Sequence, residues 1–342
     1  MNVKTNYEVA EKIVSIIRND KYQNWIEFEA EMNKIENSEA TKLMIDFYGS
    51  FDFSLYKEIL YKALNKSSFE SDDDFLNMLY SLLSRIIDEK DNLIKKLESI
   101  KRYDFTVLER KLKEKLPDDT DLDIEIYFVL DGINAGSIVG KNKMMLNALV
   151  WPSSEENINI VEGLLLHEYH HLGLLKWIRK YDESFDKYTD GKGMARYLIF
   201  SILSEGSATY FFNEGDDLYP LILESHGVDM ANQYKESTSN RAGNIKTNID
   251  ILEKDLQSLI NFDGDIEEMG EIADKYFFAN QTEPLDKAIG HHMCSNIIEK
   301  LGLDAMINCF VKPDKFIETY NKSLQDKDPC KISIDLDNLW VK

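Results

Sequence analysis

The sequence predicts an α+β fold that is mostly helical and contains one small mixed sheet. Three observations lead to this prediction. Apolar residues recur at helical spacing over residues 1–116, short apolar runs typical of strands occur at 124–130 and 143–151, and helical spacing returns from residue 153 onward. Helices are therefore expected before and after the strands in the chain.

The 342 residues are sufficient for two domains of ordinary size. We expect a helical N-terminal region at residues 1–116 and a second domain at residues 117–342. Within the second domain, the sheet and a long central helix occupy residues 117–180, and a helical lobe follows at 181–342.

Polar segments divide the first region into separate helices. The breaks are expected at residues 37–38, 49–52 and 66–74. The mixed charges from Asp88 to Lys115 are typical of a solvated helix face. This region contains no motif that points to a particular chemistry.

The charge of the chain argues against two classes of partner. The net charge is −22 at pH 7, whereas nucleic-acid binding depends on a basic surface that displaces counterions from phosphate. The same acidity argues against docking on anionic lipid. Small molecules, peptides and basic proteins are left as possible partners, and the sequence favours no particular oligomeric state.

The cysteine pattern and the N-terminus favour a cytoplasmic protein. Cys294, Cys309 and Cys330 form no CxxC pair, and an odd number without metal-ligand spacing does not indicate a disulfide framework. A reducing compartment is the simpler context. We also expect no signal peptide and no membrane span, because no apolar run is long enough for either.

Two strands are expected around a glycine-rich connection. IEIYFVL at 124–130 and KMMLNALVW at 143–151 are rich in β-branched, aromatic and other apolar residues, and Pro152 ends the second. Ser153 and Glu156 have the spacing of a capping box, which predicts that a helix begins there. The apolar residues of this helix cover most of its circumference, so we expect it to be buried.

The segment HEYHH on this buried helix carries the clearest chemical signal. His167 and His171 are four residues apart, so both imidazoles lie on one helix face and can reach one ion. Glu168 is offset by about 100° around the axis, where it can contact a water molecule rather than bind the ion. This is the HExxH pattern, in which two histidines hold zinc and the glutamate acts as general base.

The alternative interpretation is a cluster of buried histidines whose ring nitrogens bond to backbone carbonyls. Several polar groups on a buried helix would then need partners, at a cost of a few kcal/mol for each group left without one, and a metal ion removes that cost. His170 lies about 100° from His171 around the helix. We therefore interpret it as a packing or supporting residue rather than a ligand.

A catalytic zinc ion needs a third protein ligand and an open fourth position. SEGSATYFF, at 204–212, places Glu205 on the next strongly apolar helix. Gly206, Ser207 and Ala208 are small and permit another helix to approach closely. An acidic residue in such a helix is costly unless it is paired or bound to a metal ion, so Glu205 is the candidate third ligand; the alternative is a glutamate on the helix surface.

HEYHH followed by SEGSA resembles the gluzincin class of zinc metallopeptidases, including bacterial families of predicted zinc-dependent proteases. The resemblance covers residues 124–215 and implies a zincin-like core that binds Zn2+. It assigns His167, His171 and Glu205 as ligands and Glu168 as the base. The same ligands would also accept cobalt or manganese in vitro.

Two further features of this class can be placed on the chain. Many gluzincins hold the substrate backbone with an Asn-Ala pair on an edge strand before the motif helix, and Asn147 and Ala148 match that pair. Several also have an acidic residue one turn after the glutamate ligand, which orients a histidine. This chain has Thr209 there, and three acidic residues are possible substitutes: Asp182, Asp186 and Glu214.

The class also uses a downstream His or Tyr to stabilise the oxyanion. GHHMC offers His291 and His292, which point in different directions because they are adjacent on a helix. His291 is our candidate; Tyr210 and Tyr276 are alternatives. His226, in LESHGVD, is interpreted as a turn residue.

The function that the sequence favours is hydrolysis of peptide or protein substrates by a zinc-activated water. Two alternatives remain. The same centre would also hydrolyse a non-peptide amide or ester, because HExxH specifies the metal and the base but not the substrate. A helical scaffold protein with a structural zinc site would bind metal without turnover.

Overall fold

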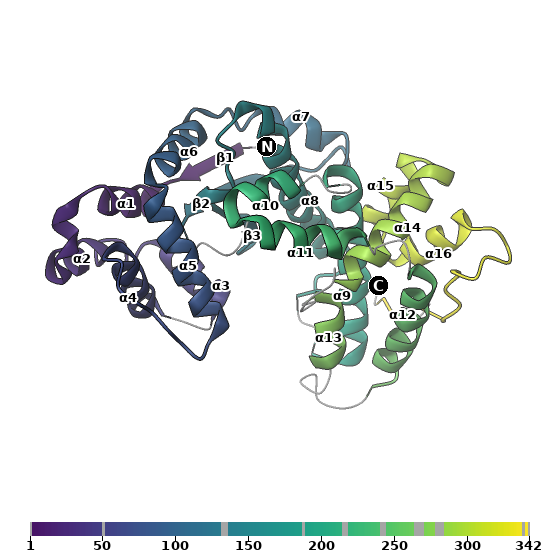
Figure 1. The fold of residues 1–342 in the computed structure, drawn as a ribbon. Helices are drawn as coiled ribbons and strands as arrows, with labels where there is room; N and C mark the ends of the chain where they lie inside the picture. The colour runs from purple at the N-terminus through teal and green to yellow at the C-terminus, as the bar shows by residue number, and fades with distance from the viewer. Residues whose placement is uncertain are drawn as a thin grey trace. The chain divides into compact units, whose positions relative to one another are not determined.

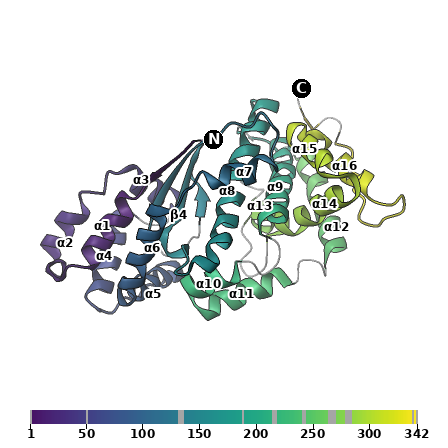
Figure 2. The same ribbon diagram turned by 90° about the horizontal axis from the view of Figure 1, so that it is seen from above.

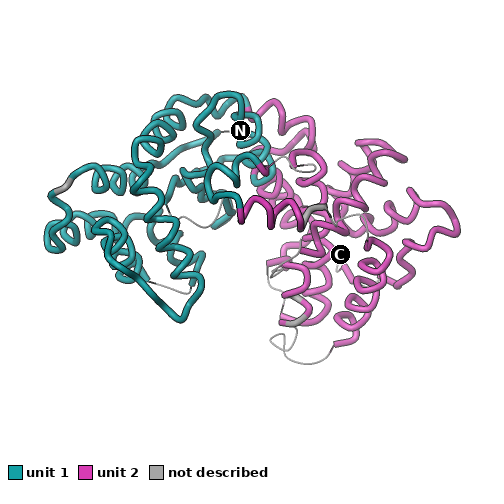
Figure 3. The backbone as a smooth tube through the Cα atoms, viewed as in Figure 1, with its two compact units in different colours: residues 1–107, 122–168, 220–228 teal, residues 108–121, 169–219, 229–342 magenta. Residues whose placement is uncertain are grey.

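The computed structural model describes residues 2–49, 52–130, 136–186, 189–213, 218–239, 244–262, 270–277, 284–336 and 339–340. The chain divides into two compact units (Figure 3). Unit 1 comprises residues 1–107, 122–168 and 220–228, and unit 2 comprises residues 108–121, 169–219 and 229–342. Each unit is built from several chain segments. The division into a helical N-terminal region at residues 1–116 and a second domain at residues 117–342 remains a prediction.

Unit 1 begins with a strand, and six α-helices follow it in the described residues up to Arg102 (Figure 1). The helices are α1 (Glu8–Ile17), α2 (Trp25–Met32), α3 (Glu39–Tyr48), α4 (Phe53–Leu64), α5 (Asp74–Asp88) and α6 (Lys90–Arg102). Side chains at the predicted breaks cap them: Ser38, Asp52 and Asp73 accept hydrogen bonds from the first-turn N–H groups of α3, α4 and α5. The predicted breaks between these helices are therefore confirmed.

A four-stranded mixed sheet lies in the same unit, with the order β1-β2-β4-β3. Its strands are β1 (Asn2–Asn6), β2 (Asp123–Val129), β3 (Gly136–Ile138) and β4 (Lys143–Asn147), and only β3 is antiparallel to its neighbour. The two predicted strands are confirmed. The expectation that the first 116 residues are helical throughout is wrong for β1, which pairs with β2 over 100 residues later.

Strand β4 is an interior strand, so the proposed edge-strand role of Asn147 and Ala148 is wrong. Both residues are buried, and the Asn147 side chain accepts a hydrogen bond from Leu149 N–H. This bond caps a 3-10 turn, η2 (Ala148–Val150), that replaces the last residues of the predicted strand. Figure 2 shows the sheet with β4 labelled, and helix α6 packs against η2, the turn that follows this strand.

The motif helix is α8 (Ile158–Tyr181). The cap predicted at Ser153 is displaced by one residue: Ser154 accepts the hydrogen bond from Glu156 N–H, and a 3-10 turn, η3 (Glu155–Asn157), precedes the helix. Ser153 instead bonds to Asn92 and Glu224. Residues of α8 up to Glu168 belong to unit 1 and the remainder belongs to unit 2.

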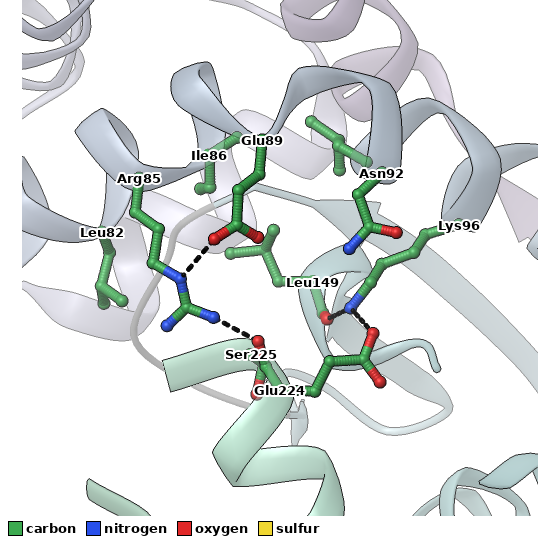
Figure 4. A pocket seen from close by; sticks show the side chains of 10 residues that line it. Leu82, Arg85, Ile86, Glu89, Asn92, Lys96, Leu149, Glu224 and Ser225 are labelled. Carbon is green, nitrogen blue, oxygen red and sulfur yellow. Dashed lines mark hydrogen bonds and ion pairs between the residues drawn. The ribbon is translucent and has the colours of Figure 1, made fainter. Parts of the chain in front are cut away.

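A polar cluster in unit 1 joins three helices and the turn that follows β4 (Figure 4). The buried Lys96 ammonium, from α6, lies 2.7 Å from the Leu149 carbonyl and 2.8 Å from a carboxylate oxygen of Glu224. Glu224 is on α10 (Tyr219–His226), and Arg85, from α5, donates to the Glu224 carbonyl and pairs with Glu89. The prediction of a solvated face from Asp88 to Lys115 is therefore wrong for Lys96.

The regular secondary structure of unit 2 is helical in the residues that the structure describes. It contains α9 (Gly191–Phe212) and α14 (Leu285–Leu301), which pack together. Its other helices include α12 (Ile245–Ile260), α13 (Gly270–Phe277), α15 (Leu303–Val311) and α16 (Phe316–Ser323). Helices α7 (Val107–Lys113) and α11 (Val228–Ser239) begin in unit 1 and continue in unit 2.

The described chain is thus mostly helical with a small mixed sheet, and α8 and α9 give it a zincin-like core. Cys294, Cys309 and Cys330 are buried free thiols. Among the described helices, none combines the length and the apolar character that crossing a membrane requires.

Candidate metal centre

Two helices bring three potential metal ligands together. His167 and His171 lie one turn apart on α8, and Glu205 lies on α9. One ligand atom from each residue lies within 4.8 Å of the other two. In the part of the chain that the structure describes, this is the one group of three or more His, Cys, Asp or Glu side chains that could hold a metal ion. Both histidines are buried, at 6% and 8% exposure.

The spacing of these atoms fits a tetrahedral zinc ion. Zinc binds nitrogen and oxygen ligands at about 2.0–2.1 Å, so neighbouring ligands of a tetrahedron lie about 3.3 Å apart. His171 Nε2 and Glu205 Oε1 are 3.3 Å apart. Two imidazoles and one carboxylate leave a fourth position open, which is typical of catalytic zinc. The three side chains could therefore hold a zinc ion.

Ser204 orients His171. The Ser204 hydroxyl lies 2.6 Å from His171 Nδ1, and both residues are buried. A metal ion on Nε2 would require the proton on Nδ1, and Nδ1 would then donate this hydrogen bond to Ser204 Oγ. The sequence did not reveal this role, although Ser204 directly precedes Glu205, because a serine on a helix gives no signal of its own.

Two of the three acidic residues proposed for orienting a histidine have other partners. Asp182 forms an ion pair with Arg196 at 3.4 Å and accepts hydrogen bonds from Ser184. Asp186 pairs with Arg179 at 2.8 Å. Glu214 lies outside the described residues.

The second oxygen of Glu205 faces a cation. Lys287 Nζ, from α14, is 3.5 Å from Glu205 Oε2. The preceding residue, Asp286, is a buried carboxyl group that accepts hydrogen bonds from the Ser201 hydroxyl at 2.6 Å and from Lys287 N–H at 2.8 Å. Burial, and next the negative charge of Glu205, raise the pKa of Asp286 to about 7. Lys287 thus lies beside two acidic groups.

Two glycines place α14 beside α9. A Cβ atom on Gly206 would lie 2.1 Å from the carbonyl carbon of Gly290, and one on Gly290 would lie 2.1 Å from the Ile202 carbonyl oxygen. Neither position can therefore accept a side chain at this helix separation. The small residues after Glu205 were predicted to permit close helix approach, and this prediction is confirmed.

The two adjacent histidines of α14 point in different directions, as predicted. The His291 ring lies 6.0 Å from the Tyr210 ring of α9, between centroids, and is half-buried. The His292 ring faces Tyr320 of α16 at 6.0 Å. Tyr276 is fully buried and donates a hydrogen bond to Asp255 at 3.1 Å, so it is engaged elsewhere in unit 2.

Of the two remaining histidines, His170 lies as expected from the sequence and His226 does not. His170 is fully buried, and its ring lies 5.2–5.8 Å from the rings of Phe211, Phe212 and Phe310. The interpretation of His170 as a packing residue is confirmed. The interpretation of His226 as a turn residue is wrong, because it is the last helical residue of α10; the chain turns at the next residue, Gly227, whose φ is 90°.

Comparisons with known proteins agree with this geometry. A family model with the description "Putative zinc dependent peptidase (DUF5700)" matches residues 32–328, which is most of the chain. No curated protein and no solved structure matches.

Proposed function

The chain belongs to this family of zinc-dependent peptidases, and from that premise we propose a ligand set and a mechanism. His167, His171 and Glu205 hold the ion, and Glu168 acts as general base in the hydrolysis of peptide bonds. The observation that carries the proposal is the convergence of these three donors within 4.8 Å. It is supported by the 3.3 Å between His171 Nε2 and Glu205 Oε1.

When bound, zinc lowers the pKa of water towards neutrality and polarises a carbonyl group. Each protein ligand contributes to holding it. His171 is oriented by Ser204, and the carboxylate of Glu205 offsets part of the charge of the ion. The net charge of two neutral imidazoles, one carboxylate and a divalent cation is positive, which favours deprotonation of water at neutral pH.

Glu168 is positioned to move protons. It follows His167 on α8, so it points about 100° away from that ligand. It is half-buried, unlike the two buried histidines, and solvent can therefore reach its carboxylate. In the proposed reaction this carboxylate accepts a proton from the attacking water and later gives it to the leaving amine nitrogen.

His291 is the proposed donor to the oxyanion. Close packing of α14 on α9 brings it beside Tyr210, five residues after Glu205. A ring N–H of His291 would donate to the carbonyl oxygen of the substrate as negative charge develops. The Tyr210 hydroxyl is the alternative donor from the same pair of helices. Single His291→Ala and Tyr210→Phe variants separate the two.

The first experiment is elemental mass spectrometry of the purified protein. About one zinc ion per chain is expected, with loss in both His171→Ala and Glu205→Ala. Zinc that persists in Glu205→Ala would remove Glu205 from the ligand set. Absence of zinc from every sample, even after incubation with the metal, would make HEYHH a buried histidine cluster.

A peptide-library digest with wild type and Glu168→Gln then tests the reaction. Cleavage by wild type and not by Glu168→Gln is expected. Turnover of small amides or esters without any peptide cleavage would indicate a non-peptide hydrolase. Bound zinc without turnover of any substrate would indicate a structural zinc site.

A further inference from the structure

The two carboxylate oxygens of Glu205 have different neighbours. Oε1 lies 3.3 Å from His171 Nε2, which is the distance between neighbouring ligands of a tetrahedral ion. Oε2 lies 3.5 Å from the ammonium of Lys287. One oxygen therefore faces the metal site and the other faces a cation supplied by α14.

The different neighbours of Oε1 and Oε2 affect whether Glu205 binds a metal ion through one oxygen or through both. A carboxylate binds a metal ion through one oxygen or through both. If both oxygens of Glu205 bound the ion, the coordination number would rise above four and the second oxygen would crowd the position of the catalytic water. A cation beside Oε2 lowers the energy of the arrangement in which only Oε1 binds.

We propose that Lys287 is a positioning residue that restricts Glu205 to binding zinc through Oε1 alone, which keeps one position open for water. The inference rests on the proposed function, because it requires the ion at the His167, His171 and Glu205 donors. Nothing in the HExxH pattern indicates Lys287, which is 82 residues beyond Glu205 in the chain.

The packing of α14 supports this role. The Gly206 and Gly290 contact fixes α14 against α9, so the backbone at Lys287 is held near Glu205 rather than on a loose segment. The side chain of Lys287 is 38% exposed and that of Glu205 is 23% exposed. The pair is thus partly screened by solvent, and it biases the carboxylate instead of locking it.

Lys287 contacts two acidic groups through different parts of the residue. Its backbone N–H donates to the buried Asp286, and its ammonium faces Glu205. Without the ammonium, Glu205 Oε2 would lose the cation that lies 3.5 Å away. The carboxylate would then gain by bringing both oxygens to the ion.

The test uses cobalt(II), which accepts the same nitrogen and oxygen ligands as zinc. Its visible absorption is strong in four-coordinate sites and weaker when the coordination number is higher. The full-length protein is loaded with cobalt as wild type, Lys287→Met, Lys287→Gln and Lys287→Arg. Lys300→Met is the matched control, because Lys300 is an exposed lysine on the same helix.

The absorption per bound cobalt ion should fall in Lys287→Met and Lys287→Gln, and it should be retained in Lys287→Arg and Lys300→Met. Wild-type intensity in both neutral variants would overturn the role of Lys287 and leave the metal centre intact. A wild-type spectrum that His171→Ala does not change would overturn the metal centre itself, and this inference with it.

Discussion

Gly206 of α9 and Gly290 of α14 face each other so closely that a Cβ atom on Gly206 would lie 2.1 Å from the Gly290 carbonyl carbon. The obstacle is backbone rather than a flexible side chain, so it cannot move aside. Glu205 directly precedes Gly206, and Lys287 lies three residues before Gly290. The distance between the two helices therefore controls the surroundings of the candidate third ligand.

Gly206→Ala should destabilise the protein and weaken metal binding together. The added methyl group forces α9 and α14 apart, and such overpacking costs roughly 1–3 kcal/mol, with this rigid contact at the upper end. Chemical denaturation and competition for zinc with a chelator measure the two effects. Gly270→Ala is the control, because nothing lies within 4 Å of a Cβ at Gly270. Unchanged stability of Gly206→Ala would show that the helices can separate without cost.

Ser204→Ala should reduce zinc affinity about 10–100-fold, the usual cost of losing the hydrogen-bond partner of a metal-binding histidine. The reason is that His171 Nδ1 loses the hydroxyl 2.6 Å away that fixes its ring and tautomer. Chelator competition gives the affinity. Ser207→Ala is a matched control, because Ser207 is also buried on α9 but bonds to the Leu203 carbonyl. Equal affinities of the two variants would contradict an orienting role for Ser204.

Glu168→Gln should retain zinc while peptide cleavage falls about 10²–10⁴-fold, the range that a positioned general base contributes. Glutamine keeps the size of the side chain and loses its ability to accept a proton. Zinc content and cleavage rate are measured on the same preparation. Glu162→Gln, on the same helix, is the control, because Glu162 accepts a hydrogen bond from Tyr103 instead. Full cleavage by Glu168→Gln would assign the base to another residue.

Local signals in the sequence accounted for much of this architecture. Helix ends in the first region follow from Ser38, Asp52 and Asp73, whose capping bonds involve residues two or three positions away. The relation of His167 to His171 is equally local, since it depends only on the helical repeat. Features that depend on residues close in sequence could thus be predicted from the sequence alone.

Features that depend on distant contacts could not be predicted in this way. Strand β1 has the polar sequence NVKTN and forms a strand because β2 supplies its hydrogen-bond partners. Lys96 lies in a charged run typical of a solvated face, yet its ammonium is buried beside the Leu149 carbonyl and Glu224. Lys287 approaches Glu205 only because two glycines let α14 pack closely on α9. In each case the partner lies more than 50 residues away.

Glu224→Gln should destabilise unit 1 more than Lys96→Met does. In Glu224→Gln, the ammonium of Lys96, whose side chain is 5% exposed, loses its counter-ion, and an unpaired buried charge costs about 3–5 kcal/mol. In Lys96→Met, the Glu224 carboxylate is 26% exposed and still accepts two hydrogen bonds from Ser153. Chemical denaturation of both single variants and the double variant gives the coupling energy. Additive effects would show that the pair is not coupled.

The stability difference between wild type and Lys96→Met should depend on pH. Burial opposes ionisation of Glu224, but hydrogen bonds from Lys96 and Ser153 outweigh it and hold the pKa of Glu224 below its usual 4.5. A carboxyl group whose pKa is lower in the folded state contributes stability above the unfolded pKa, and this contribution is lost as the pH falls through the folded value. The contribution of Glu224 to the difference in unfolding free energy should therefore be complete at neutral pH and shrink below about pH 4.5.

At the alkaline end Lys96 causes a second rise in stability with pH. Burial lowers the pKa of its ammonium below 10.5, so the unfolded state binds the extra proton in this range. Wild type should accordingly gain stability relative to Lys96→Met as the pH rises towards 10.5. Denaturation curves across this pH range measure both effects. If the difference in unfolding free energy between wild type and Lys96→Met were constant from acid to alkaline pH, the ammonium and the carboxylate would be as well solvated in the folded protein as in the unfolded chain.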